Sequence, residues 1–425
     1  MLDARRGGRR ISLLWLLVGP GMLAMLGEND GPSMLSYAAS GAAFGVGFFL
    51  PFIAVTFIGA MIVQEMAMRV GAVTHRGYGE LVFQRFGATW GWLAASDLLI
   101  TNLVTLITEF IAIKVGMGFF GIPTPIAAAF GIALVLASIS GGRYWRWERV
   151  ALTLAAFNLV FLVTAVLVHP DAGRVARAFA TWTPLPHGSP QTLLLLLASD
   201  IGATVTPWMI FFQQSAVVDK GMTPRDIPQG RADTIAGGVV AAVAACATVV
   251  TAAALFDHHV TVGGPGGAAF AAALRPVAGL PVGAIFSLGL IEAGALASLT
   301  ISASTAYAFG EAVSGAHSFN RRLRDAPLFY AFNTGMAAVA AAVVLIPGAP
   351  LLAITLNANL LATVLMPAAL IFLLLLANDR ELMGSRVNTR VANWAGGLTG
   401  ALVGLAGAAY AVVAFFNALT GHPGG

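Results

Sequence analysis

The chain has 425 residues, of which 58% are apolar and only 10% carry a charge, and its formal net charge is +4. A soluble globular protein carries roughly a quarter charged residues, so this composition excludes an ordinary soluble domain. The basic residues are dispersed over short segments and do not gather on one polar face, which excludes a nucleic-acid-binding surface. We therefore expect the lipid bilayer, and no nucleic acid, as a partner.

Apolar blocks near 20 residues match the roughly 30 Å hydrocarbon thickness of a bilayer. Together with the Gly, Pro and charged interruptions between them, they predict an all-α polytopic membrane protein of about eleven transmembrane helices. The predicted spans are 11–41, 44–70, 88–118, 124–141, 149–168, 191–219, 232–256, 281–313, 328–347, 350–377 and 392–418.

Basic residues indicate the orientation. Four arginines (Arg5, Arg6, Arg9 and Arg10) precede the first apolar stretch, and no small-residue cleavage site follows it, which favours a retained span over a signal peptide. With the N-terminus inside, the cytoplasmic segments hold 19 of the 23 Lys and Arg residues and the outer loops hold three. This bias predicts a multi-pass protein of the cell inner membrane with a cytoplasmic N-terminus.

The first span is interrupted over 27–33, which reads Gly-Glu-Asn-Asp-Gly-Pro-Ser. Pro32 removes a backbone donor and Gly31 permits unusual dihedral angles, so an ordinary helix should break here. A carboxylate inside the bilayer costs at least about 2.5 kcal/mol, which marks Glu28 and Asp30 as functional. In an unwound stretch, residues two apart share a side, so both acids are able to face one cation.

The second and third spans carry further charges. Glu65 and Arg69, four residues apart, are predicted to pair on one helix face. Asp97 and Glu109 are pathway candidates in the third span, although a structural role for either stays open. Lys114 is the one plausible intramembrane cation, so the pathway should be electronegative and favour cations.

The sixth span repeats the pattern of the first, reading Asp-Ile-Gly-Ala-Thr-Val-Thr-Pro-Trp-Met over 200–209. Each interruption falls in the first helix of a five-span set, and an odd number of spans inverts the second set. Paired Gly/Pro interruptions in inverted halves indicate a binding site near the midplane. Two ordinary proline kinks are the alternative, but carboxylates accompany the first interruption.

The eighth span contributes Glu292, which is either a pathway residue or a protonated hydrogen-bonding group between helices. The predicted organisation is one transmembrane transporter domain over 1–425, with a first inverted repeat over 11–168, a second over 191–377 and an extra span over 392–418.

The residues of both interruptions resemble the signatures of the Nramp family of divalent-metal transporters. Gly19-Pro20-Gly21 and Asp30-Gly31-Pro32-Ser33 resemble its first-span Gly-Pro-Gly and Asp-Pro-Gly-Asn, and 202–209 resembles its sixth-span Gly-Ala-Thr-Val-Met-Pro-His-Asn. Similarity continues through 63–87, 286–311 and 359–367. The resemblance implies the LeuT-type 5+5 inverted-repeat fold, with broken first and sixth helices.

The resemblance also implies a set of metal ligands. Asp30 matches the metal-binding aspartate, Ser33 the asparagine ligand, and Ala203 the residue that offers a backbone carbonyl. Thr206 matches the methionine ligand, and Asn359 matches a polar tenth-span residue that closes on the ion. Glu28 is an additional acid beside this set, and we include it among the candidate ligands.

Departures from the family pattern bear on selectivity. Oxygen ligands suit hard Mg²⁺ or Mn²⁺, whereas a thioether selects softer metals. Thr206 replaces the thioether, and Met209 would need a different rotation to supply sulfur. Trp208 replaces a histidine tied to proton movement; it is a gate, a packing residue or an aromatic wall. Glu109 matches the proton-relay aspartate, but Ala112 stands where a glutamate is expected.

This pattern resembles the Nramp-related magnesium transporter branch. The expected function is import of Mg²⁺, with Mn²⁺ also carried, by alternating access without proton coupling. A proton-coupled Mn²⁺/Fe²⁺ importer is the alternative, and an amino-acid transporter on the same fold is a more distant one. No HExxH, Gly-x-Ser-x-Gly or P-loop motif occurs in the sequence, so we expect no enzyme, no cofactor beyond the transported metal, and no obligate protein partner.

Overall fold

The computed structural model describes residues 18–139, 143–183, 190–260, 262, 267–313, 315, 317–349 and 351–420. Within these ranges all regular structure is helical. The four N-terminal arginines and the first residues of the first predicted span, 11–17, lie outside the described residues.

Nine helices in the described ranges are long and apolar enough to cross a membrane. One further apolar helix is shorter, and the interrupted first span supplies the remaining predicted crossing. The prediction of an all-α polytopic protein is therefore confirmed. The spanning elements are α2 (Pro20–Gly27) with α3 (Gly31–Phe44), α4 (Phe49–Thr74), α6 (Ala88–Phe119), the shorter α7 (Thr124–Ile139), α8 (Tyr144–Ala155) with η2 (Ala156–Leu159) and α9 (Val160–Leu167), α11 (Pro190–Gly202) with α12 (Pro207–Asp219), α13 (Ile227–Asp257), α15 (Leu280–Ala312), α16 (Pro327–Leu345), α17 (Leu351–Asn378) and α19 (Arg390–Thr420).

The first break is shorter than the predicted 27–33. Helix α2 ends at Gly27 and α3 begins at Gly31, so only residues 28–30 are non-helical. Pro32 lies in the first turn of α3. Backbone N–H groups there have no acceptor within the helix, so a proline loses no helical hydrogen bond. The sixth-span break is likewise short, covering 203–206, and Pro207 opens α12. Each proline therefore starts the second half-helix and does not lie in the unwound segment.

Several span boundaries differ from prediction. The fifth span begins at Tyr144 and the seventh at Ile227, each five residues before the predicted start. The fifth span is extended by an amphipathic first turn, and the seventh by a first turn that contains a proline, so both helices begin before their apolar blocks. Short connecting helices were not predicted because they are too short or too polar to read as spans: α5 (Tyr78–Phe86), α10 (Ala172–Thr181), α14 (Gly267–Ala278), α18 (Arg380–Met383) and η3 (Gly384–Arg386).

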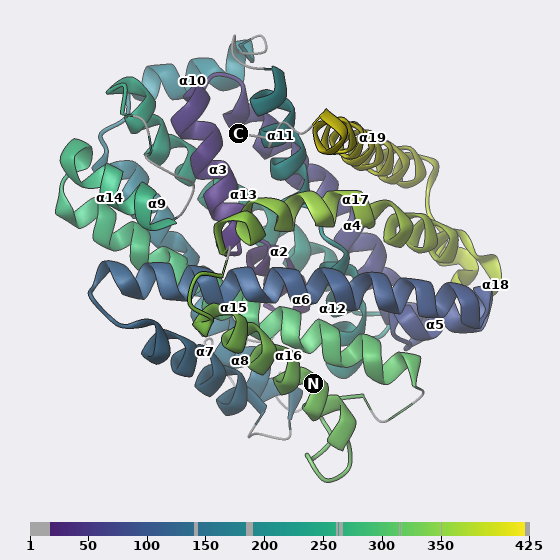
Figure 1. Ribbon diagram of the computed structural model, residues 1–425. Helices are drawn as coiled ribbons and strands as arrows, with labels where there is room; N and C mark the ends of the chain where they lie inside the picture. The colour runs from purple at the N-terminus through teal and green to yellow at the C-terminus, as the bar shows by residue number, and fades with distance from the viewer. Residues whose placement is uncertain are drawn as a thin grey trace, which may run out of the picture.

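The broken helices lie in the middle of the bundle. Helices α6 and α15 pack side by side across the centre, and α13 packs on α2, α3 and α4 (Figure 1). Helix α3 contacts α11, and α2 contacts α12, so the halves of the two broken helices meet each other. Both breaks are therefore enclosed by neighbouring helices.

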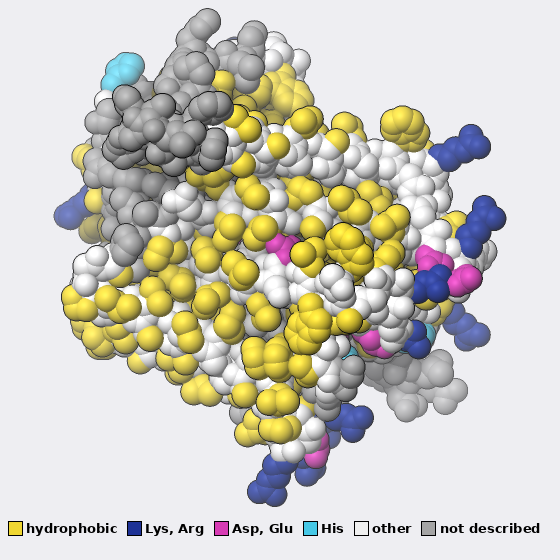
Figure 2. Space-filling view, turned by 45° about the vertical axis from the view of Figure 1, so that its right-hand side comes forward, with side chains coloured by type: hydrophobic (Ala, Val, Ile, Leu, Met, Phe, Trp, Pro, Cys, Tyr) yellow, Lys and Arg dark blue, Asp and Glu magenta, His cyan; other side chains and the backbone are white. Residues whose placement is uncertain are grey.

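The outer surface suits lipid. Apolar side chains cover much of the face in Figure 2, whereas most of the basic side chains visible there lie at its right and lower margins. On α19, Val391 is 77% exposed and Trp394 is 81% exposed. Side chains of this kind are stable on a helical surface that faces hydrocarbon.

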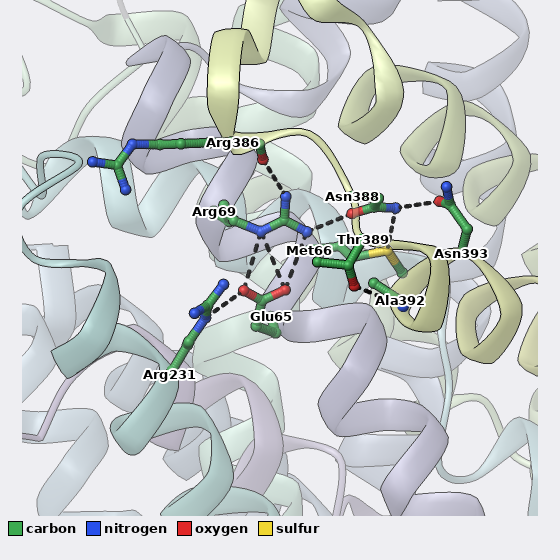
Figure 3. A network of polar contacts seen from close by, with 9 residues as sticks. All are labelled: Glu65, Met66, Arg69, Arg231, Arg386, Asn388, Thr389, Ala392 and Asn393. Atoms are coloured by element: carbon green, nitrogen blue, oxygen red, sulfur yellow. Dashed lines mark hydrogen bonds and ion pairs between the residues drawn. The ribbon is translucent and has the colours of Figure 1, made fainter.

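A polar network fastens α19 to the rest of the molecule (Figure 3). The predicted Glu65–Arg69 pair is confirmed, with Nε 3.1 Å from Oε1. Arg69 also donates to the carbonyl of Arg386 and to Oδ1 of Asn388, both at 2.5 Å. Glu65 accepts a second ion pair from Arg231 of α13 at 2.8 Å. Arg69 therefore joins α4 to the segment that leads into α19.

Candidate functional site

The first break holds three buried polar residues. Glu28, Asn29 and Asp30 are each at most 1% exposed. Asp30 has an extended backbone, and its Oδ1 accepts from the Ser33 amide at 2.9 Å, so it caps α3. A carboxylate is stabilised at the N-terminus of a helix because exposed amides and the helix dipole point toward it.

The second break is organised around Thr206, the N-cap of α12. Its side chain accepts from the Met209 amide, and the Met209 sulfur accepts from the Thr206 amide at 3.4 Å. The thioether is therefore folded back onto the break. This rotation was not predicted from the sequence, and it places a sulfur beside the residue that stands where the family has methionine.

Direct hydrogen bonds join the two breaks. The Thr206 hydroxyl donates to Oε2 of Glu28 at 3.1 Å. The Tyr37 hydroxyl, on α3, donates to the carbonyl of Ala203 at 2.9 Å. A carbonyl has two lone pairs, so Ala203 keeps one for another partner. The structure thus brings Glu28, Thr206 and Ala203 to one place.

The third span reaches the first break at Glu109. Oε2 of Glu109 accepts from the Gly31 amide at 2.9 Å. A methyl group on Gly31 would lie 2.4 Å from Cβ of Ala112, so small residues let these helices touch. Lys114 forms no ion pair with Glu109 or with any other described carboxylate. The acid therefore has no basic neighbour to neutralise it.

Trp208 packs against the end of α2, next to the first break. The indole is fully buried, and a Cβ on Gly27 would lie 3.0 Å from its Cη2. The ring lies 6.0 Å from that of Phe212, and Ser304 of α15 donates to the Trp208 carbonyl at 2.9 Å. Its side chain thus fills the space where α2, α12 and α15 meet.

Asn359 of α17 also lies beside the second break. It is 4% exposed, and a Cβ on Gly202 would lie 2.1 Å from its carbonyl oxygen. Helix α17 therefore contacts the last residue of α11, at the point where the second break begins.

The two remaining candidates, Glu292 and Asp97, differ in whether they connect to the breaks. Glu292 connects to the first break indirectly, because Asn158 of η2 donates to its carboxylate and accepts from Asn29. Asn29 and Asn158 were missed as site residues; their only sequence signal is an amide inside an apolar span. Asp97 lies near Tyr78 of α5, and it is about 18 Å along α6 from Glu109. The structure does not bring Asp97 to the breaks.

The electrostatics of the site favour a cation. Glu28, Asp30 and Glu109 interact electrostatically with one another, and no Lys or Arg in the described ranges pairs with any of them. Four buried oxygens near the first break lack a hydrogen-bond partner within the part of the chain that the structure describes: Glu28 Oε1, Asn29 Oδ1, Ser33 Oγ and Glu109 Oε1. Buried polar atoms are normally partnered, so these oxygens suit an ion or its bound water.

The donor set is not a compact cluster of acids. No group of three or more His, Cys, Asp or Glu side chains within the described chain is close enough to hold a metal ion. A cation here would therefore need hydroxyl, amide and carbonyl oxygens together with the carboxylates. Such ligands suit a hard divalent ion that retains water.

A helical bundle with two broken helices meeting at its centre defines a membrane protein of the LeuT-type class. The chain matches the family model described as natural resistance-associated macrophage protein-like over residues 21–413, and it therefore belongs to the Nramp family. The predicted family is thus confirmed.

Curated relatives match over part of their length. The divalent metal cation transporter MntH of Latilactobacillus sakei is 29% identical over 227 residues, covering 51% of this chain and 48% of the relative. MntH 1 of Pseudomonas aeruginosa is 30% identical over 210 residues, covering 48% and 47%. The aligned segments thus span about half the length of these relatives.

Solved structures share the fold. The Eremococcus coleocola manganese transporter, crystallised with an aromatic bis-isothiourea compound, has a TM-score of 0.79 at 18% identity, covering 99% of this chain and 90% of that one. A Na⁺-coupled sialic acid symporter in an outward-open state has a TM-score of 0.54 at 11% identity, covering 95% and 90%. These likenesses concern the fold alone.

Proposed function

We propose that this protein imports divalent metal cations by alternating access, with Mg²⁺ favoured, Mn²⁺ also carried, and no proton coupling. The observation that carries the proposal is the first break, where Glu28, Asp30 and Ser33 are buried. Among the described residues, Glu28, Asn29 and Ser33 there and Glu109 of α6 each have one unpartnered oxygen. Removing such groups from water is costly unless something binds them. A divalent cation supplies that partner.

The oxygen donors support a hard ion. Asp30, Ser33, Ala203 and Thr206 offer carboxylate, hydroxyl and carbonyl oxygens, and the small hydroxyl side chains leave room for water. Mg²⁺ dehydrates reluctantly and usually keeps several waters. Small oxygen ligands of this kind therefore fit a partly hydrated Mg²⁺ better than a tight shell of large direct ligands would.

The membrane potential is able to drive entry. Each charge gains about 2.3 kcal/mol per 100 mV, so a divalent ion gains about twice that. Neither break contains a histidine, and Trp208 takes the position after Pro207. These features agree with uptake that needs no proton.

Two polar contacts are positioned to open and close the pathway. In one half of the bundle, Asp200 of α11 accepts from Ser36 and Ser40 of α3 at 2.6 and 2.7 Å. In the other half, Asp233 of α13 accepts from the Gly19 and Gly21 amides at 2.8 Å. With the N-terminus in the cytoplasm, the first contact closes the outer side and the second closes the inner side.

The inverted-repeat organisation is part of this proposal. The first repeat covers 11–168, the second covers 191–377, and α19 is the extra span. Short helices α5 and α14 follow the second span of each proposed repeat, which agrees with the correspondence. At the far end of α12, a cavity of about 310 Å³ is bordered by Asp219, Glu311 and His317, and it offers an exit for a cation.

A proton-coupled Mn²⁺/Fe²⁺ importer is the second candidate. The Met209 sulfur lies 3.4 Å from the Thr206 amide, so a thioether is present at the break after all. Thioethers favour softer transition metals. The curated relatives are named divalent metal cation transporters, and a structural neighbour is named a manganese transporter.

The test is flux in liposomes that contain the purified protein. Mg²⁺ and Mn²⁺ influx and internal pH are followed for the wild type, for Asp30→Ala and for the exposed control Asp171→Ala. Mg²⁺ influx without acidification, abolished only by Asp30→Ala, is expected. Mn²⁺ influx with acidification and no Mg²⁺ influx would select the second candidate, and no flux of either ion would refute divalent-metal transport.

A further inference from the structure

Asn29 in the first break has its amide held in one orientation. Its Nδ2 donates to the carbonyl of Ala241 at 3.0 Å and to Oδ1 of Asn158 at 2.8 Å. A backbone carbonyl only accepts hydrogen bonds, so the atom that faces Ala241 must be the nitrogen. Both N–H groups of Asn29 are therefore used, and its amide is unable to flip without losing both bonds.

The orientation continues through Asn158 to Glu292. Because Asn158 presents Oδ1 to Asn29, its Nδ2 must face the carboxylate of Glu292, at 3.0 Å from Oε1 and 3.2 Å from Oε2. This chain of hydrogen bonds runs from α13 through the first break and η2 to α15, and every donor in it meets an acceptor. Its direction is set by the Ala241 carbonyl at one end and agrees with the carboxylate at the other.

One acceptor is left over. Oδ1 of Asn29 is buried, in a residue that is only 1% exposed, and it has no hydrogen-bond partner among the described residues. It lies in the same three-residue break as Glu28 and Asp30. An unpartnered buried acceptor lowers stability, so the arrangement is expected to have a use.

We propose that Oδ1 of Asn29 is a further ligand of the transported divalent cation, and that Asn158 and Glu292 are positioning residues that hold this oxygen in place. The inference rests on the proposed transport function and adds a residue that the ligand set did not contain. An amide oxygen is a neutral, hard donor that suits Mg²⁺ and Mn²⁺. It therefore adds a ligand without adding a third negative charge beside the two acids.

Residues behind a ligand fix its orientation and affect affinity by roughly 10–100-fold. The chain of hydrogen bonds predicts that the loss of affinity is largest for a substitution at Asn29 and smaller for residues further from the ion. Replacing Asn29 removes the metal ligand itself. Replacing Asn158 leaves the Asn29 oxygen present but frees the Asn29 amide to rotate. Glu292 acts one step further away and touches neither the ion nor the break.

The first experiment measures Mn²⁺ and Mg²⁺ binding to the full-length purified protein by calorimetry. Asn29→Leu should weaken both affinities by about tenfold or more, by loss of one ligand. Asn333→Leu is the matched control, because Asn333 is a buried amide on α16, which packs on α6, α7 and α15 and not on the breaks. It should bind as the wild type does.

The second experiment exchanges the charge within the chain. Asn158→Asp places a carboxylate against Glu292 and should weaken binding by about tenfold. Adding Glu292→Gln supplies an amide donor to that carboxylate, so the double variant should recover to within about threefold of the wild type. A merely structural role would lower the thermal stability of Asn158→Asp and leave its metal affinity near that of the wild type.

The outcomes separate the two proposals. Wild-type affinity in Asn29→Leu, with the wild type binding and transporting metal, would overturn this inference alone. Weaker binding in Asn29→Leu and Asn333→Leu alike would overturn it as well, because the effect would then be general. If the wild type neither binds nor transports either ion, the proposed function fails and this inference falls with it.

Discussion

The hydroxyl of Thr206 donates to Oε2 of Glu28 at 3.1 Å, so one hydrogen bond joins the sixth-span break to the first-span break. The two residues are separated by most of the first half of the chain, and both are at most 1% exposed. Hydrogen bonds to a charged group contribute about 1.5–3 kcal/mol. This bond orients one oxygen of Glu28 and leaves Oε1 without a partner.

The first prediction concerns this bond. Thr206→Val keeps the shape of the side chain but removes the donor, whereas Thr206→Ser keeps the hydroxyl. We expect Thr206→Val to weaken Mg²⁺ binding by about tenfold, and Thr206→Ser to stay within about threefold of the wild type. Calorimetry on the purified protein measures both. Binding within about threefold of the wild type in Thr206→Val would show that the hydrogen bond does not matter.

The second prediction addresses the sulfur. Met209→Leu removes the thioether and retains an apolar side chain of similar volume. If the site selects hard ions, Mg²⁺ influx should stay within about twofold of the wild type, because oxygen ligands remain. Cd²⁺, a softer ion, provides the comparison. A loss of Cd²⁺ and Mn²⁺ influx that exceeds the loss of Mg²⁺ influx by tenfold would assign the sulfur to the metal and support the second candidate.

The positions of both breaks followed from the sequence, because Gly and Pro stand beside acids inside apolar spans. The extent of the first break did not. Pro32 was read as a helix breaker, yet it opens α3, since a proline in a first turn loses no hydrogen bond. Whether such a proline ends one helix or starts the next depends on the cap, and here Asp30 provides it.

Long-range contacts at the site were beyond sequence reasoning. Thr206 and Asn359 were expected in one ligand set through the family resemblance, whereas Glu28 was added because it is an acid beside Asp30. In the structure Glu28 and Thr206 lie in the two breaks, and Asn359 lies beside the second. The Asn29–Asn158 hydrogen bond was not expected, because nothing in either local sequence identifies the partner. Asp97 was selected for being an acid in a span, but its place on α6 keeps it far from Glu109. An acid in a span does not show which neighbour it faces.

The third prediction concerns the contact of α3 with α11. Asp200 accepts hydrogen bonds from the hydroxyls of Ser36 and Ser40. Replacing both serines by alanine leaves a buried carboxylate without these donors, which should lower the free energy of unfolding by about 1–3 kcal/mol. Thermal unfolding in detergent measures the loss. Ser138→Ala is the control, since among the described residues its hydroxyl bonds only to Val135 of its own helix. An equal loss in the control would contradict the prediction.

The fourth prediction concerns the start of α2. Asp233 accepts from two amides there, and Lys220 pairs with Glu148 at 2.9 Å and donates to the Val18 carbonyl at 3.0 Å. The N-cap residue of α2 has no side chain to cap the helix, so Asp233 caps it from another span. Loss of this cap should let α2 move away from the bundle.

Labelling of a cysteine placed at Ala24 measures that movement, in a Cys246→Ser background that removes the native thiol. Ala24 is fully buried on α2, so reaction with a water-soluble thiol reagent reports opening. Asp233→Leu should accelerate labelling by about tenfold, as expected for loss of about 1.4 kcal/mol from the closed state. Asp257→Leu, in an exposed ion pair with Arg174, should not change the rate. Unchanged labelling in Asp233→Leu would show that α2 is held closed by packing.

The last prediction compares two Arg–Glu pairs with the same helical spacing. The Arg69 side chain is 5% exposed, whereas that of Arg76, paired with Glu80, is 48% exposed. Arg69→Leu removes a buried donor from Glu65, the Arg386 carbonyl and Asn388, although Glu65 keeps its pair with Arg231. Thermal unfolding should therefore occur several degrees lower in Arg69→Leu, because buried partners lose their bonds. Arg76→Leu should unfold close to the wild type, since exposed pairs contribute little. Equal shifts in the two variants would mean that the network in Figure 3 does not fasten α19 to α4.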